Sequence, residues 1–135
     1  MLLDHIGVAV TDVTAAAAAY ALLGFSATEA EDVPLDQVRV VMLPLTNGGR
    51  IELLQPLSEE SPVARFLQRH GPGLHHVAFR VTDIHATLEA VAAAGLAVID
   101  TAPRPGAGGQ LVAFLHPRSL GGVLIELCER GEGQG

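Results

Sequence analysis

Hydrophobic and polar positions follow the same order of strands and helices twice along this chain of 135 residues. Apolar residues alternating with small or polar ones predict a strand over 2–10, and the alanine-rich run after it predicts a helix over 14–23 that ends at Gly24. Thr11 or Asp12 is expected to cap that helix. Further strands are predicted at 25–30, 37–43 and 50–55, with turns around Pro34 and at 46–49.

A short linking helix is predicted between the two halves. Ser61 is a preferred N-cap residue and Pro62 is favoured at the first helical position, so the helix is expected to begin there and to end before Gly71. The second half repeats the order, with strands at 74–81, 97–100, 110–115 and 122–128 and a helix at 84–94. The pattern therefore predicts one α+β domain over 1–135, with a module at 1–57, the linking helix at 61–70, a second module at 73–129 and a flexible tail at 130–135.

The two halves also share their sequence. Residues 3–13 match 74–84 at an offset of 71 positions, and residues 50–54 match 124–128 at an offset of 74. Each copy carries one histidine near its start and one glutamate near its end. The repeat therefore supplies four equivalent polar residues, which are His5, His76, Glu52 and Glu126.

These four residues are predicted to bind a metal ion. Strand alternation puts each of them on the face opposite to its aliphatic neighbours, and the small Gly7, Ala9 and Ala78 leave space beside the histidines. A lone His or Glu in a strand is more often structural than a ligand. Recurrence at equivalent positions of two copies favours a shared site, because a pseudo-twofold packing of the copies would bring all four residues to one point.

Two imidazoles and two carboxylates suit an octahedral divalent ion with two positions left for water or substrate, and Co, Mn, Ni and Zn all fit. Two adjacent open positions imply a substrate that chelates through two oxygens. The ion would then act as a Lewis acid on developing enolate charge.

Composition narrows the classes of partner. A net charge of −7 with scattered cations argues against a nucleic-acid partner. No apolar run approaches the ~20 residues of a membrane span, and the start resembles no secretory signal, so a cytoplasmic protein without a membrane partner is predicted. All 8 cationic residues are arginines, which excludes Schiff-base chemistry and a lysine base. The single Cys128 is expected to be an inert thiol.

Four stretches of the sequence carry a resemblance to a known family; they are 4–10, 51–57 with 61–67, 73–79, and 114–118 with 121–127. In these stretches the chain resembles the vicinal oxygen chelate superfamily, also called the glyoxalase and bleomycin-resistance fold. Within it, the chain is most similar to the methylmalonyl-CoA epimerases. The Ser-Pro start of the linking helix and the His-Pro-Arg segment before Gly-Val-Leu-Ile-Glu-Leu are more specific to the epimerases than the ligand pattern is.

The resemblance implies two βαβββ modules that form a curved mixed sheet around a central metal site. It implies ligation of one divalent ion by His5, His76 and Glu126, with Glu52 at a position that is Gln in some members. The implied reaction interconverts the 2R and 2S epimers of methylmalonyl-CoA by 1,1-proton transfer through a metal-stabilised enolate. A homodimer is expected by analogy.

Epimerisation requires a proton to leave one face of C2 and return to the other, so acid and base groups are needed there. Some bacterial members carry a Glu in the strand before the Glu52 strand, where this chain has Val40. Glu126 is therefore the best candidate for the base, and Glu52 and His116 are weaker ones. A loop histidine beside a proline could equally hold a turn.

The resemblance leaves open the residues that bind coenzyme A and the exact activity. For coenzyme A, Arg118 and Arg104 are the candidate phosphate partners. A lactoylglutathione lyase-type (glyoxalase I) isomerase would use the same four ligands, whereas a non-enzymatic drug-binding resistance protein of the same fold would need none of them. An extradiol dioxygenase fits less well, since it normally combines one carboxylate with two histidines in a larger chain.

Overall fold

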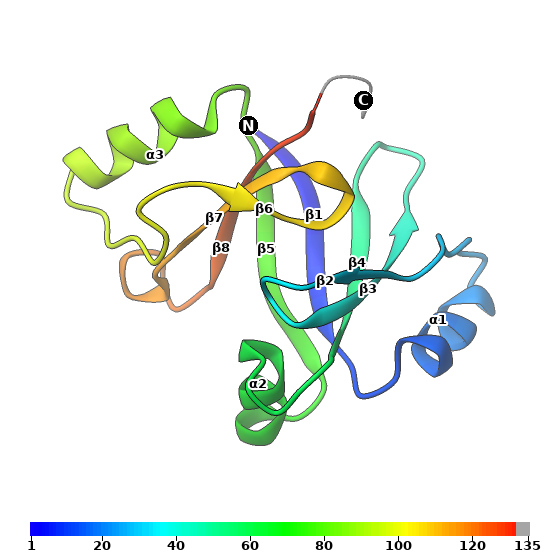
Figure 1. Ribbon diagram of the computed structural model, residues 1–135. Helices are drawn as coiled ribbons and strands as arrows, with labels where there is room; N and C mark the ends of the chain where they lie inside the picture. The colour runs from blue at the N-terminus through cyan, green and yellow to red at the C-terminus, as the bar shows by residue number, and fades with distance from the viewer. Residues whose placement is uncertain (132–135) are drawn as a thin grey trace. The chain divides into compact units, whose positions relative to one another are not determined.

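The structure, a computed structural model, describes residues 1–131 (Figure 1). The chain forms two compact units. One unit consists of residues 5–75, and the other consists of residues 1–4 together with the chain from His76 onward. Each unit therefore contains most of one sequence repeat, and the unit boundaries fall directly before the two histidines that the repeat singles out.

The unit of residues 5–75 contains most of the first repeat. Its strands are β1 (Leu2–Ala9), β2 (Glu31–Val33), β3 (Val38–Pro44) and β4 (Arg50–Pro56), and its helices are α1 (Val13–Ala21) and α2 (Pro62–His70). The strand order is β2-β3-β4-β1, with β1 parallel to β4 and the other pairs antiparallel. Helix α1 packs on β3 and β4, where it encloses the buried Val13, Val41, Leu43 and Leu53. The face of β4 that carries Glu52 lies opposite to this core.

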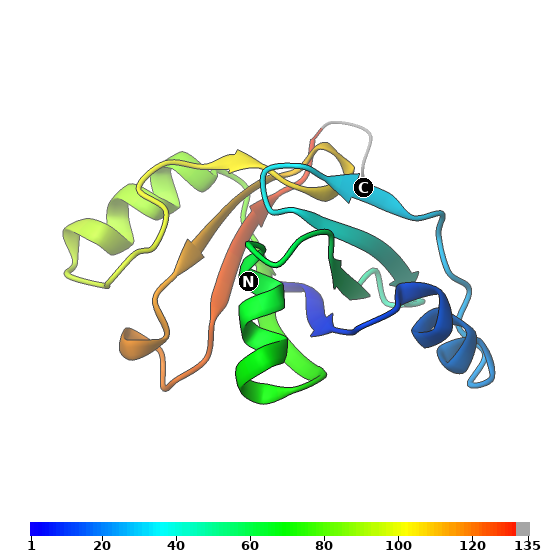
Figure 2. The same ribbon diagram turned by 60° about the horizontal axis from the view of Figure 1, so that its bottom comes forward.

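The other unit repeats this arrangement. Its strands are β5 (Gly73–Arg80), β6 (Arg104–Pro105), β7 (Leu111–Leu115) and β8 (Ile125–Glu129), and its helix is α3 (Ile84–Ala93). The strand order is β5-β8-β7-β6, with β5 parallel to β8. Helix α3 lies beside β7 and β8 (Figure 2). The buried core between them consists of Ile84, Leu88, Ala113, Leu115 and Leu127.

Helices α1 and α3 begin in the same way. The carboxylates of Asp12 and Asp83 accept hydrogen bonds from backbone N–H groups of the first turn, which confirms Asp12 as the predicted cap. A second side chain reaches the first N–H of each helix: Gln55 Oε1 accepts from α1 at 3.0 Å and Glu129 Oε1 from α3 at 2.9 Å. Both acceptors lie three residues after the glutamate of their repeat, so one strand supplies a candidate ligand to one face and a cap to the other.

The predicted linking helix is confirmed. Ser61 is the N-cap of α2 and its side chain accepts from the Val63 N–H at 3.2 Å, while Pro62 occupies the first turn. Gly71 ends the helix with a φ of 72°, in the left-handed region that favours glycine.

The second strand of each repeat lies later than predicted. Strands were expected at 25–30 and 97–100, whereas the structure has β2 at Glu31–Val33, β6 at Arg104–Pro105 and a single bridge at Val98. In both places, backbone hydrogen bonds to the neighbouring strand are joined by one from a side chain. Thr28 Oγ1 accepts from the Met42 N–H at 3.0 Å, and Asp100 Oδ2 accepts from the Phe114 N–H at 2.8 Å.

The end of the chain also differs from the prediction. β8 begins at Ile125 rather than at 122, because Gly121 and Gly122 form a turn with positive φ. Arg130, which was assigned to a flexible tail, is bound to Asp4, so the ordered chain includes it. Of the predicted tail, residues 132–135 lie outside the described residues. Among residues 1–131, no helix has the length and hydropathy needed to cross a membrane.

Candidate metal site

In the unit of residues 5–75, the predicted ligands His5 and Glu52 lie together. Because β1 runs parallel to β4 with Gly7 opposite Glu52, His5 and Glu52 project from the same face of two neighbouring strands. His5 Nε2 lies 3.7 Å from Glu52 Oε1, and the two side chains are 2% and 9% exposed. Gly7, directly opposite Glu52, adds no side chain to this face.

The other unit brings His76 and Glu126 together in the same way. Ala78 on β5 lies opposite Glu126 on β8, two residues after His76. His76 Nε2 lies 3.9 Å from Glu126 Oε2, and the side chains are 2% and 7% exposed. Each unit therefore holds one buried His–Glu pair, which confirms the faces predicted from strand alternation.

The spacing within each pair fits a metal ligand set. Both separations exceed the 3.5 Å limit of a hydrogen bond between the two atoms. Two donors with bonds of about 2.1 Å to one ion lie at most about 4.2 Å apart, and both pairs are inside that limit. Imidazole nitrogen with carboxylate oxygen is a donor set for Zn, Co, Mn or Ni. Each pair can thus offer two ligands to a divalent ion.

The two pairs have different neighbours on the adjacent strand. Met42 lies directly opposite Glu52, whereas Phe114 lies directly opposite Glu126. The Phe114 ring meets His76 edge to face, with centroids 5.5 Å apart. The Arg104 guanidinium lies 5.5 Å from the centroid of the Phe114 ring and is held by Asp100 at 3.3 Å. The His5–Glu52 pair is therefore bordered by the flexible side chain of Met42. The His76–Glu126 pair is bordered by the Phe114 ring, which also contacts Arg104.

Val40 brings an aliphatic side chain to the face that carries Glu52. It pairs with Leu54 across the β3–β4 ladder, two positions from the Met42–Glu52 pair, and it is 3% exposed. The strand beside Glu52 consequently presents no acid or base at this position.

The weaker catalytic candidate, His116, holds a turn. Its Nδ1 accepts a hydrogen bond from the Arg118 backbone N–H at 3.1 Å, as the N-cap of the 3₁₀ turn at Pro117–Ser119. The Arg118 side chain starts from this turn, and the residue is exposed. Of the two candidate phosphate partners, Arg118 is thus on the surface, whereas Arg104 is bound to Asp100 and Phe114.

His75, which precedes the candidate ligand His76, packs elsewhere. Its ring meets Phe66 of α2 edge to face at 4.9 Å. Burial lowers the pKa of His75 below its usual value, and the negative charge of Asp36 partly offsets this effect. This packing agrees with strand alternation, which directs His75 to the face opposite to that of its neighbour His76.

Sequence reasoning missed Asp4 and left Cys128 without partners. Asp4 is completely buried and forms ion pairs with Arg80 and Arg130. The buried Cys128 thiol donates to the Phe79 carbonyl at 3.5 Å. The only local signal for Asp4 was its position directly before His5, because its partners lie 76 and 126 residues away.

Residues 4–114 match the model of the Glyoxalase/Bleomycin resistance protein/Dioxygenase superfamily. The ethylmalonyl-CoA/methylmalonyl-CoA epimerase of Cereibacter sphaeroides is 41% identical over 128 residues, which cover 93% of this chain and 95% of that protein.

Solved structures of methylmalonyl-CoA epimerases are similar to this chain. The methylmalonyl-CoA epimerase of Mycobacterium tuberculosis superposes with a TM-score of 0.91 at 34% identity, covering 96% of this chain and 87% of that one. A methylmalonyl-CoA epimerase in complex with methylmalonyl-CoA and NH4+ gives a TM-score of 0.90 at 35% identity, covering 97% of this chain and 95% of that one.

Proposed function

The chain belongs to the Glyoxalase/Bleomycin resistance protein/Dioxygenase superfamily, and from this premise we propose that it is an epimerase acting on methylmalonyl-CoA. It interconverts the 2R and 2S epimers by moving a proton at C2 from one face to the other. The observation that carries the proposal is that each repeat holds one buried His–Glu pair, on equivalent strands. The epimerases among its relatives support the choice of substrate.

The proposed metal site consists of His5, Glu52, His76 and Glu126, one pair from each repeat. The donor set and the spacing within each pair support Co, Mn, Ni or Zn. When bound, such an ion supplies Lewis acidity toward two oxygens of the substrate, which lowers the cost of removing the proton at C2.

Glu126 is the proposed acid–base residue on one face of C2. Its carboxylate is buried beside Ala78 and Phe114, so water is largely excluded from the proton that it exchanges. Glu52 occupies the equivalent position of the other repeat and is the proposed partner on the opposite face. The aliphatic Val40 leaves Glu52 as the acidic residue of that β3–β4 face. His116 is a weaker candidate because its Nδ1 already caps a turn.

Arg118 and Arg104 are the proposed partners of the coenzyme A phosphates. Arg118 is exposed and can meet a long ligand from solvent. Arg104 is held at a fixed place by Asp100 and Phe114, so it would bind an anion with little loss of side-chain entropy.

Deuterium wash-in at C2 of methylmalonyl-CoA in D₂O tests the activity. The wild-type protein with added Co²⁺ is expected to incorporate deuterium, and Glu126→Gln to lose about 10²–10⁴-fold of that rate. Glu89→Gln, at an exposed glutamate of α3, is the matched control and should retain the wild-type rate. Absence of wash-in by the wild-type protein would refute the proposal.

The same preparation separates the alternatives. Formation of lactoylglutathione from its hemithioacetal without wash-in would indicate a glyoxalase I type isomerase. If the purified protein contains no metal and still binds a drug, it would instead be a drug-binding resistance protein. A homodimer and a cytoplasmic location remain predictions, which sedimentation and fractionation would test.

A further inference from the structure

A completely buried carboxylate joins three strands in the unit formed by residues 1–4 and the chain from His76 onward. Asp4 Oδ1 lies 3.0 Å from Arg80 Nε and 2.8 Å from Arg130 Nε, and both groups donate hydrogen bonds to it. The arginine side chains are 24% and 11% exposed. We call these three residues the Asp4 network.

Each member of the Asp4 network lies close in sequence to a proposed metal ligand. Asp4 directly precedes His5 on β1, Arg80 follows His76 by four residues on β5, and Arg130 follows Glu126 by four residues at the end of β8. Residues four apart on a strand project from the same face. The two arginines therefore stand on the face that carries His76 and Glu126, at equal distance along their strands.

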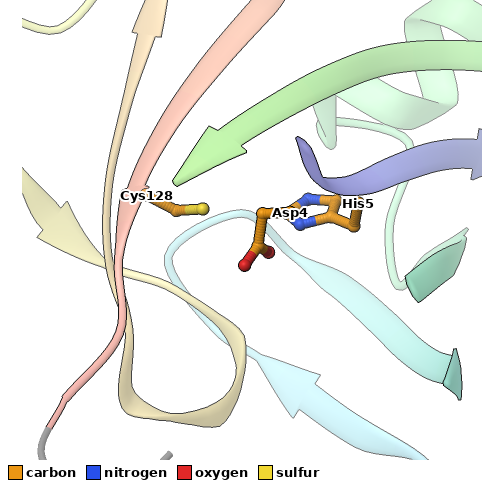
Figure 3. A group of neighbouring side chains, drawn as sticks. All are labelled: Asp4, His5 and Cys128. Atoms are coloured by element: carbon orange, nitrogen blue, oxygen red, sulfur yellow. The ribbon is translucent and has the colours of Figure 1, made fainter. Parts of the chain in front are cut away.

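Small buried residues occupy the strand positions between the Asp4 network and the proposed ligands His76 and Glu126. Ala78 and Cys128 occupy the positions midway along β5 and β8, and they form a buried cluster with Val112. Figure 3 shows the Cys128 side chain together with Asp4, and their potential ligand atoms lie within 4.8 Å of one another. A shift of either strand at the arginine end is transmitted through this cluster to the ligand end, because close-packed interiors do not deform freely.

The energetics favour a geometric role. A buried carboxylate loses its favourable hydration, and a well-formed ion pair does little more than offset that loss. What such a pair does impose is one arrangement of its partners, since any other leaves a buried charge unpaired.

We infer that Asp4 is a positioning residue, which acts through Arg80 and Arg130 to fix the strands bearing His76 and Glu126 at the spacing that both residues need to bind a metal ion. This inference rests on the proposed metal site. It assigns no contact between Asp4 and the ion or the substrate.

Arg130→Met tests the inference with the smaller risk of unfolding, because Arg80 continues to neutralise Asp4. Calorimetric titration of the metal-free protein with Co²⁺ should show affinity reduced by about 10-fold or more, the size typical of residues that orient metal ligands. Arg130→Lys should recover most of the loss, and Asp4→Asn should lose at least as much as Arg130→Met. Urea unfolding of each metal-free variant identifies the conditions in which it is folded, and the titrations are run there.

The control is Arg39→Met, which removes a comparable ion pair at the surface. Arg39 Nε lies 2.8 Å from Asp32 Oδ1, and both side chains are more than 40% exposed. Its Co²⁺ affinity should equal that of the wild type. If folded Arg130→Met binds Co²⁺ as tightly as the wild type, the network is only structural and the inference is wrong. If the wild-type protein itself binds no Co²⁺, the proposed metal site fails and the inference fails with it.

Discussion

Phe114 lies directly opposite Glu126 across the β7–β8 ladder, at the position that Met42 holds opposite Glu52 in the other repeat. The backbone frame is the same in both copies, whereas the side chain beside the glutamate is not. The Phe114 ring also contacts His76 and supports Arg104. The two His–Glu pairs are consequently bordered by different side chains, although the pairs themselves are equivalent.

Phe114→Leu is expected to destabilise the protein by about 1 kcal/mol, because the edge contact with His76 and the cation–π contact with Arg104 are both lost. Urea unfolding of Phe114→Leu, Arg104→Met and the double variant measures the coupling. We expect about 0.5–1 kcal/mol between the two residues. Strict additivity of the two single changes would contradict the contact.

Metal ions are expected to stabilise the fold. A ligand that binds only the folded state adds about 2.7 kcal/mol at a free concentration 100 times its dissociation constant. Thermal or urea unfolding with rising Co²⁺ should show this increase, and EDTA should reverse it. His76→Gln should abolish the increase, whereas His85→Gln, at an exposed histidine of α3, should retain it.

The helix caps of the two repeats should contribute similarly. Asp12→Ala and Asp83→Ala each remove a carboxylate that accepts from the first turn of a helix, which typically costs about 1 kcal/mol. Urea unfolding should give similar losses for both variants, and Asn at either position should restore most of the stability. A loss confined to one repeat would show that the equivalent second caps, Gln55 and Glu129, differ in strength.

The exposed Asp32–Arg39 pair gives a defined pH dependence. The hydrogen bond and charge of Arg39 hold the pKa of Asp32 below its ordinary value of 3.8. A carboxyl whose pKa is lower in the folded state stabilises the fold above the unfolded pKa, and this contribution is lost as pH falls through the folded pKa. NMR titration should place Asp32 below 3.8 in the wild type, and Arg39→Met should return it to that value. An unchanged midpoint in Arg39→Met would mean that the pair does not form in solution.

Cys128 should be unreactive in the folded protein. The side chain is fully buried and its thiol faces the Phe79 carbonyl, so a thiol reagent has no access to it. Ellman's reagent should react slowly in buffer and with one equivalent in urea. Rapid reaction of the folded protein would contradict the burial of this strand.

Local patterns in the sequence predicted the elements that local forces determine. Alternation predicted β1, β3, β4, β5 and β7, and cap residues predicted α1 and α2, because these features depend on residues a few positions apart. Helix α3 was predicted from the repeated order of elements. The His–Glu pairs were predicted because both residues recur at equivalent positions of the two copies. Neither alternation nor duplication tests the proposed roles of these residues in metal binding and proton transfer.

Features that depend on distant partners were missed. The segments at 25–30 and 97–100 have the composition of strands, yet Thr28 and Asp100 use side chains to bind the neighbouring strand. No periodicity relates Asp4 to Arg130, which are 126 residues apart. The same distance explains why Arg130 was assigned to a tail: its partner lies at the other end of the chain.

The first four residues belong to the unit built mainly from the second repeat, and this has a consequence for dissecting the chain. A cut at the linking helix would separate the repeats in sequence but would leave Asp4 on one fragment and both of its arginines on the other. Neither fragment would carry a complete unit. The fragment with the first repeat would therefore carry the Asp4 carboxylate without either arginine that binds it in the intact chain.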